Sequence, residues 1–196
     1  MLGAVADMTK THHILLVAVI GVVSLIAFTY QVGQTEVVFN ANTPKHQPLS
    51  LESIAKKMSF KNATALFDIK SVSIKLPTWL PEGLKPTTAY CLSNVAVFVY
   101  SSKGVESIGS AEFTLQITFS DTLPFDPKTS KGTFMKVGEY DVYYDMAAAE
   151  GSNEYRSIYG PTCKLLVLHA GNVNYWLKGN PTFSFDDMVR IATSLS

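Results

Sequence analysis

Charged residues are scarce in this sequence, and neither sign is in excess. Lys, Arg, Asp and Glu make up 16% of the 196 residues, and 16 basic side chains balance 16 acidic ones. A chain with a formal net charge of zero has no basic field that would attract nucleic acid. We therefore expect no nucleic-acid partner. The length predicts one domain, or one domain with an appendage.

Histidine and cysteine are also rare, with four and two residues. No two histidines have the spacing of metal ligands, and no C-x-x-C motif occurs. The G-x-S-x-G motif of serine hydrolases and the G-K-[ST] ending of phosphate-binding loops are absent as well. The sequence thus predicts no catalytic residue, no metal site and no cofactor, and we expect that the protein is not an enzyme.

Two groups of polar residues leave a chemical alternative open. His169 is compatible with a catalytic triad, although a local hydrogen bond at a strand end is the favoured interpretation. The carboxylates of Asp141, Asp145, Glu150 and Glu154 are close in sequence and could bind a cation or form a catalytic pair. Their alternation with tyrosines favours a solvated strand face instead.

One long apolar run lies near the start of the chain. Ile14 to Tyr30 contains no charged residue, and it spans roughly 25 Å as a helix, or about 30 Å with its flanks. It therefore predicts a transmembrane signal anchor over residues 14–31, with the membrane as its partner. The alternative of a cleaved signal peptide would have a shorter apolar region, usually about 7–15 residues, before small residues. A buried helix of a soluble protein is disfavoured because the run has no polar face.

The charges around this run predict its orientation. Lys10 precedes the run, and no Lys or Arg follows it until Lys45. The positive-inside rule then places residues 1–13 in the cytoplasm and the rest of the chain outside it. Polar and turn-forming residues with two prolines make residues 32–48 a linker. Residues 49–196 then form an extracytoplasmic domain at the cell membrane.

The pattern of residues 49–196 predicts an α+β domain with an antiparallel sheet. Residues 50–60 have a helical apolar stripe behind Ser50, and residues 184–196 have another behind the capping residue Ser184. Between them, about five or six strands are expected to meander, with the C-terminal helix packed on the sheet. The clearest strand patterns cover residues 94–101, 111–119, 139–146, 162–170 and 172–179.

Both cysteines follow the predicted anchor. An even number of cysteines in an exported domain favours a disulfide between Cys91 and Cys163. Two buried thiols are the alternative. Asn62-Ala63-Thr64 is an acceptor sequence for N-glycosylation, which has meaning only in a host that glycosylates.

Tyrosines are concentrated between residues 139 and 160. Tyr143 is on the opposite strand face from Tyr140 and Tyr144, so it is a candidate for exposure. Tyrosine and arginine are enriched in binding hot spots. The sequence therefore suggests a partner-binding surface for an envelope protein, composed of Tyr143, Tyr155, Arg156 and Tyr159. Ordinary packing of tyrosines at the sheet margin is the alternative.

A proline bracket, "LPTWLPEGLK", precedes the expected sheet. Pro77 and Pro81 disfavour helix in the residues before them, and Gly83 permits a turn with positive φ. We expect Trp79 and Leu80 to pack under the sheet edge. Exposure of Trp79 in a ligand-binding groove is the alternative.

This bracket and the ending "NYWLKGNPTFSFDDMVRIATSL" resemble a family of small prokaryotic extracytoplasmic domains of unknown function. In that family, P-x-x-L-P-E-G precedes the first sheet strand, and a Y-x-L-x-G strand leads into an S-x-E-E-L-x-x-I-A-x-S-L helix. Its members often follow one transmembrane helix, and some are joined to anti-sigma-factor segments or are lipoproteins. Residues 1–13 are too short for a sigma-binding segment, and no lipobox cysteine is present. The resemblance implies a membrane-tethered exported domain and no catalytic residues.

These observations together predict a single-pass, membrane-anchored extracytoplasmic domain that binds or senses a partner without enzymatic activity. A carrier or chaperone for an apolar ligand, held in a cavity between sheet and helices, is one alternative. A pilin-like envelope subunit is another, although no prepilin-peptidase site precedes Ile14.

Overall fold

The structure is a computed structural model that describes residues 50–69 and 73–196. The predicted anchor over residues 14–31 and the linker over residues 32–48 lie outside these residues. In the part of the chain that is described, no helix is both long and apolar enough to span a membrane.

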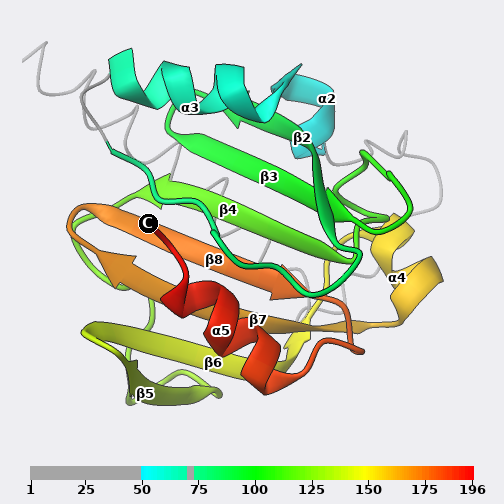
Figure 1. The fold of residues 1–196 in the computed structure, drawn as a ribbon. Helices are drawn as coiled ribbons and strands as arrows, with labels where there is room; N and C mark the ends of the chain where they lie inside the picture. The colour runs from blue at the N-terminus through cyan, green and yellow to red at the C-terminus, as the bar shows by residue number, and fades with distance from the viewer. Residues whose placement is uncertain (1–49, 70–72) are drawn as a thin grey trace, which may run out of the picture. The chain divides into compact units, whose positions relative to one another are not determined.

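In the described part of the chain, eight antiparallel strands form a single sheet, most of which is labelled in Figure 1. One half contains β1 (Lys56–Met58), β2 (Lys85–Leu92), β3 (Val95–Ser101) and β4 (Phe113–Phe119) in chain order. The other half contains β5 (Thr133–Val137), β6 (Tyr140–Ala149), β7 (Thr162–Ala170) and β8 (Val173–Gly179). The halves join where β4 pairs with β8, for example at Leu115 and Leu177.

This topology confirms the α+β class and the antiparallel sheet. The predicted number of strands was too low, because the short strands β1 and β5 carry too few residues for a period-two pattern. A single meander is also wrong. After β4 the chain crosses to the far edge of the sheet, and it returns strand by strand until β8 lies beside β4.

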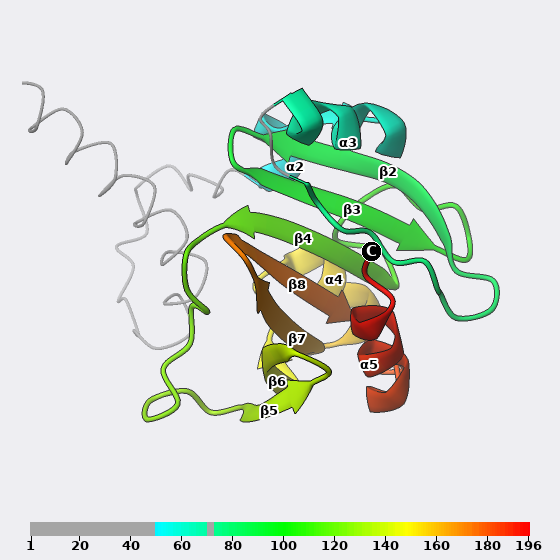
Figure 2. The ribbon, with the colours of Figure 1, turned by 60° about the vertical axis from the view of Figure 1, so that its left-hand side comes forward.

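Helices cover one face of the sheet (Figure 2). Helix α3 (Phe60–Ile69) contributes Ala63 and Phe67 to the main core, and α5 (Phe185–Thr193) contributes Met188 and Ile191. The predicted packing of the C-terminal helix on the sheet is confirmed. Its Ser184 cap is present too, since the hydroxyl accepts the Asp187 N–H at 2.9 Å.

The opposite face is covered by shorter pieces. Helix α4 (Asn153–Tyr159) lies on one part of it, and Leu123 and Phe125 from the loop after β4 lie on another. Ala55, next to helix α2 (Leu51–Ile54), and Ile108 pack on a third part. Both faces of the sheet are therefore covered, although regular helices dominate only one.

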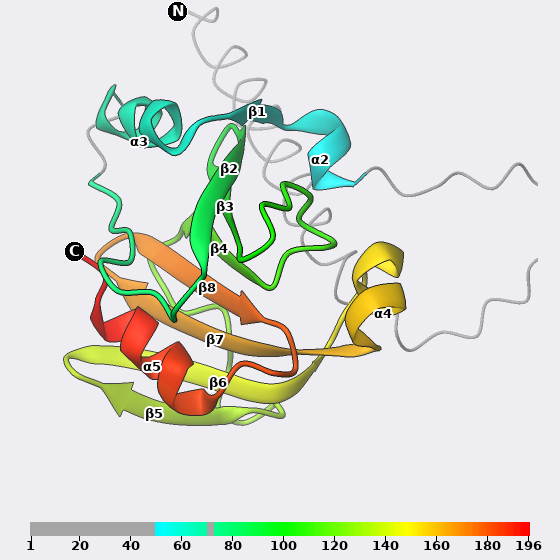
Figure 3. The ribbon, with the colours of Figure 1, turned by 45° about the vertical axis from the view of Figure 1, so that its right-hand side comes forward.

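The helix predicted over residues 50–60 is wrong in its extent. Ser50 does cap a helix, but α2 ends at Ile54, and Ala55 is already extended. The chain then forms β1 along the edge of the sheet and turns into α3 on the other face (Figure 3). Pairing with β2 outweighs the weak helical preference of this short segment.

The proline bracket has a scaffold role, as expected. Pro77 forms a β-bridge with Leu195, and the Thr78 N–H donates to the Ser194 carbonyl at 3.1 Å. The Trp79 ring is partly buried against the main core, with the Arg190 guanidinium 4.0 Å from its centroid. The bracket thus packs against the end of α5, which brings together two segments more than 100 residues apart in the chain.

Candidate functional site

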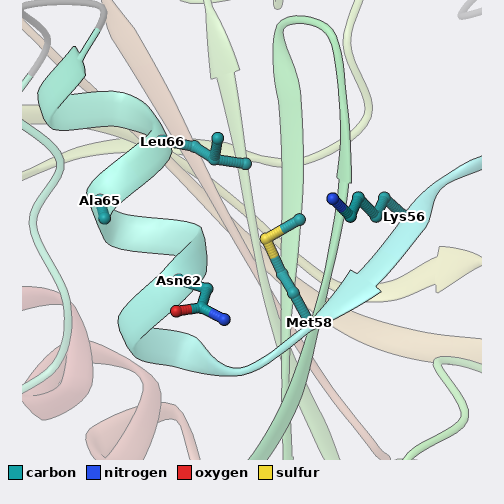
Figure 4. Close-up of a pocket in the computed structure, with 5 residues that line it drawn as sticks. All are labelled: Lys56, Met58, Asn62, Ala65 and Leu66. Atoms are coloured by element: carbon teal, nitrogen blue, oxygen red, sulfur yellow. The ribbon is translucent and has the colours of Figure 1, made fainter.

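An apolar groove opens between α3, β1 and the turn that joins β2 to β3 (Figure 4). Its larger part has a volume of about 280 Å³. A smaller part of about 140 Å³ shares Lys56, Met58 and Leu66 with it. We call the two parts together the α3–β1 groove. The larger part is lined by Lys56, Met58, Asn62, Ala65 and Leu66, and the smaller part adds Phe67, Cys91, Ser93 and Val95.

The local sequence explains why this groove is apolar. Helix α3 buries Ala63 and Phe67 against the sheet, while the neighbouring Leu66 is 40% exposed. Strand β1 alternates, so that Lys56 and Met58 face the groove while Lys57 extends to Glu106. An exposed leucine beside a half-buried methionine leaves apolar area in contact with water, which is unfavourable in an isolated molecule.

Lys56 is the charged side chain of the groove. Ion pairs within the described residues join Lys57 to Glu106, Lys136 to Asp141, and Lys178 to Glu150, and none of them includes Lys56. The hydrogen bond with Glu106 raises the pKa of Lys57. Among the side chains that the structure describes, none of the carboxylates thus forms an ion pair with Lys56 at the rim of this apolar surface.

The size and lining of the groove suit contact with apolar side chains. Sites for drug-sized ligands usually enclose about 300–1,000 Å³, whereas the larger part of the α3–β1 groove has about 280 Å³ and is open to solvent. Over residues 50–69 and 73–196, no set of three or more His, Cys, Asp or Glu residues is arranged to hold a metal ion. The groove can accept one or two apolar side chains and pair an anion with Lys56.

The residues of the predicted tyrosine surface differ in burial, and they do not form one exposed surface. Tyr143 is 5% exposed and stacks on Phe125 with ring centroids 3.8 Å apart. Tyr155 is 1% exposed, its hydroxyl donates to the Gly179 carbonyl at 3.2 Å, and burial raises its pKa. The Tyr159 hydroxyl donates to the Ser110 carbonyl at 3.0 Å. Only Arg156 of the predicted set is exposed, so a partner surface built on Tyr143 and Tyr155 is wrong.

The two cysteines do not form the predicted disulfide with each other. Cys91 is on β2 and Cys163 is on β7, and β3, β4 and β8 lie between these strands. They also belong to cores on opposite faces. Neighbouring strands are about 4.8 Å apart, whereas a disulfide spans at most about 7 Å between Cα atoms.

Desolvation raises the pKa of the Cys163 thiol to about 12. Cys163 is therefore a buried neutral thiol, whereas Cys91 is half-buried, so the alternative of two buried thiols holds for Cys163 alone.

The remaining polar residues are found in separate places. His169 Nδ1 lies 2.8 Å from the Asn174 amide oxygen, so the predicted local contact at a strand end is confirmed. Asn62 is exposed on α3 and lines the groove.

The four carboxylates do not form one site. Their partners differ: Asp141 pairs with Lys136, Asp145 accepts the Ala147 N–H, Glu150 pairs with Lys178, and Glu154 accepts from Ser107 and Ser110.

Sequence reasoning missed the α3–β1 groove. A signal was present, since Phe60, Ala63 and Phe67 follow helical spacing. The exposure of Leu66 depends on how α3 is rotated on the sheet, and that rotation is a tertiary property.

The chain matches no protein-family model, and comparisons with curated proteins and with solved structures find no match either. The resemblance to prokaryotic extracytoplasmic domains rests on its two motifs and stays a prediction.

Proposed function

We propose that the chain is a single-pass, membrane-anchored protein whose residues 49–196 form an extracytoplasmic binding or sensing domain without enzymatic activity. The charge-free run from Ile14 to Tyr30 supports the anchor. The positive charge on its N-terminal side, at Lys10, supports the orientation. The motifs shared with extracytoplasmic domains support the same arrangement.

One observation carries the binding part of this proposal: the α3–β1 groove exposes Leu66 and Met58 next to Lys56. Apolar surface bordered by charged groups is typical of contacts with other proteins. The groove lies at the edge of the sheet, where a partner can approach it without any change in the core.

A carrier for an apolar ligand is less well supported. Such a protein would enclose its ligand between the sheet and the helices. In this domain, that layer contains closely packed side chains, among them Phe67, Met188 and Ile191, each no more than 3% exposed. We therefore favour contact with a protein over enclosure of a small molecule.

The location of the domain is tested by thiol labelling in intact cells. Both native cysteines are replaced by serine, and the exposed Lys103 is changed to cysteine. A membrane-impermeant maleimide should then label Lys103→Cys before lysis. Labelling that requires lysis would contradict the extracytoplasmic location.

The binding role is tested by photocrosslinking in intact cells. A benzoylphenylalanine in place of the groove residue Ala65 should give a discrete crosslinked product. The matched control places it at Glu139, an exposed residue in the turn before β6 at the opposite edge of the sheet. Adding Leu66→Glu to the Ala65 variant should remove the product. Equal products from both positions, or products that survive Leu66→Glu, would contradict a binding role for the groove.

A further inference from the structure

We propose that the α3–β1 groove binds a protein segment that carries an apolar side chain with a carboxylate next to it, and that Lys56 selects the carboxylate. This inference rests on the proposed function, because it names the chemistry of the partner that the groove would contact. It assigns the apolar part of the contact to Met58 and Leu66 and the polar part to Lys56.

The apolar part follows from the side chains that converge on the groove (Figure 4). Met58 extends from β1 and Leu66 from α3 toward the same space, and Phe67 lines the smaller part of the groove. A methionine side chain is flexible and polarisable, so it adapts to differently shaped apolar partners. Leu66 is 40% exposed, so a partner side chain seated here would remove apolar area from water.

The polar part follows from the charges around the groove. Lys56, Lys57 and Lys61 lie within six residues of one another. Glu106 pairs with Lys57 at the opposite face of the strand. Glu52 is also engaged there, since it accepts hydrogen bonds from the Ile108 N–H and the Ser107 hydroxyl. Among the residues that line the larger part of the groove, Lys56 is the charged one, and no lining residue is acidic.

Charge complementarity therefore favours an anionic partner group over a cationic one. A carboxylate beside an apolar side chain can reach Lys56 while the apolar side chain contacts Met58. An exposed ion pair contributes little affinity, on the order of 0.2–1 kcal/mol. The apolar contact should thus supply most of the affinity, and Lys56 should decide which apolar segments are accepted.

The test pans a displayed library of random peptides on the full chain in detergent micelles. Peptides enriched by the wild-type chain should combine Leu, Ile, Met or Phe with a neighbouring Asp or Glu. Lys56→Glu should weaken binding of an enriched acidic peptide about tenfold and favour basic peptides instead. Lys103→Glu is the matched control, because it makes the same charge change at an exposed site away from the groove. It should leave the affinity unchanged.

The other outcomes separate this inference from the function on which it rests. Apolar peptides enriched without acidic residues, and bound equally by Lys56→Glu, would overturn the role of Lys56 and leave a groove that binds proteins. Peptides that still bind after Leu66→Glu would overturn the groove as the site. Failure to enrich any peptide would count against both proposals. A concentration-dependent dimer that Leu66→Glu abolishes would identify a second copy of the chain as the occupant of the groove. That result would overturn the inference that an acidic segment binds there.

Discussion

Residues of the same type have different roles in this domain because they differ in burial. Tyr143 and Tyr155 look like contact residues in the sequence, yet both belong to the core on the second face of the sheet. Lys57 pairs with a glutamate at an exposed position, and Lys178 pairs with one at a nearly buried position. The ion pairs within residues 50–69 and 73–196 do not include Lys56. The role of each side chain follows from what covers it rather than from its type.

The first prediction concerns Cys163. In the native protein without reductant, this thiol should resist alkylation at neutral pH, because it is 4% exposed and desolvation raises its pKa to about 12. Denaturation without reductant should make it react fully, as measured by mass spectrometry of its peptide. A Cys163 peptide that reacts only after reduction would instead show that Cys163 is part of a disulfide.

The second prediction compares two ion pairs. Glu150 accepts from Lys178 at 2.8 Å with 9% of its side chain exposed, and it also accepts the Ser152 N–H at 2.8 Å. Glu150→Ala should lower the free energy of unfolding by about 1–3 kcal/mol, because it leaves a largely buried ammonium unpaired.

Asp141 provides the matched control for this prediction. It pairs with Lys136 at 2.7 Å, but its side chain is 70% exposed. Asp141→Ala should change the free energy of unfolding by about 0–1 kcal/mol in urea titration. Equal effects of the two variants would show that burial does not set the strength of these pairs.

Secondary-structure elements were predictable where their own pattern was long. Strands β4, β7 and β8 and helix α5 lie within or match the predicted ranges. Strands β1 and β5 form because a neighbouring strand pairs with them, and nothing in their own few residues requires it. The short length of β1 also protects this edge of the sheet. Strand β1 has three residues and lies between two helices in the chain, and short edge strands discourage pairing with other chains.

The third prediction tests the start of helix α5. Ser184→Ala removes the hydroxyl that accepts the Asp187 N–H at 2.9 Å. This substitution should lower the free energy of unfolding by about 1 kcal/mol. Ser184→Asp should retain most of the stability that the cap contributes, because a carboxylate also caps a helix. Thermal denaturation followed by circular dichroism measures both. Equal losses in the two variants would mean that the cap is not what Ser184 contributes.

The whole domain is held together by contacts between segments that are distant in the chain. Leu115 in β4 faces Leu177 in β8, and both are fully buried. The main chain of residues 76–78 bonds to the last residues of the chain, 194–196. The two halves of the sheet share one core on the helical face, so neither half can bury its apolar surface alone.

The fourth prediction follows from this shared core. Trp79 reports on the bracket beside α5, and Trp176 reports on β8 and the opposite face. Variants Trp79→Phe and Trp176→Phe each leave one fluorescent probe. Probes in different places report coincident transitions only when a domain unfolds as one unit.

In these variants, the added substitution Leu115→Ala should lower both urea midpoints together, with a loss of about 2–5 kcal/mol. A midpoint that moves for only one probe would show that the halves unfold separately.

The sequence by itself determined the α+β class, the antiparallel sheet, the longer strands and the capped C-terminal helix. Each of these depends on a period of two or 3.6 residues, or on a cap, that lies within a few consecutive residues. Only the tertiary structure decided that β4 pairs with β8, that Tyr143 is buried, that Cys91 and Cys163 are apart, and that Leu66 is exposed beside Lys56. The physical reason is that a local pattern shows which two faces an element has, whereas what covers each face comes from segments tens of residues away.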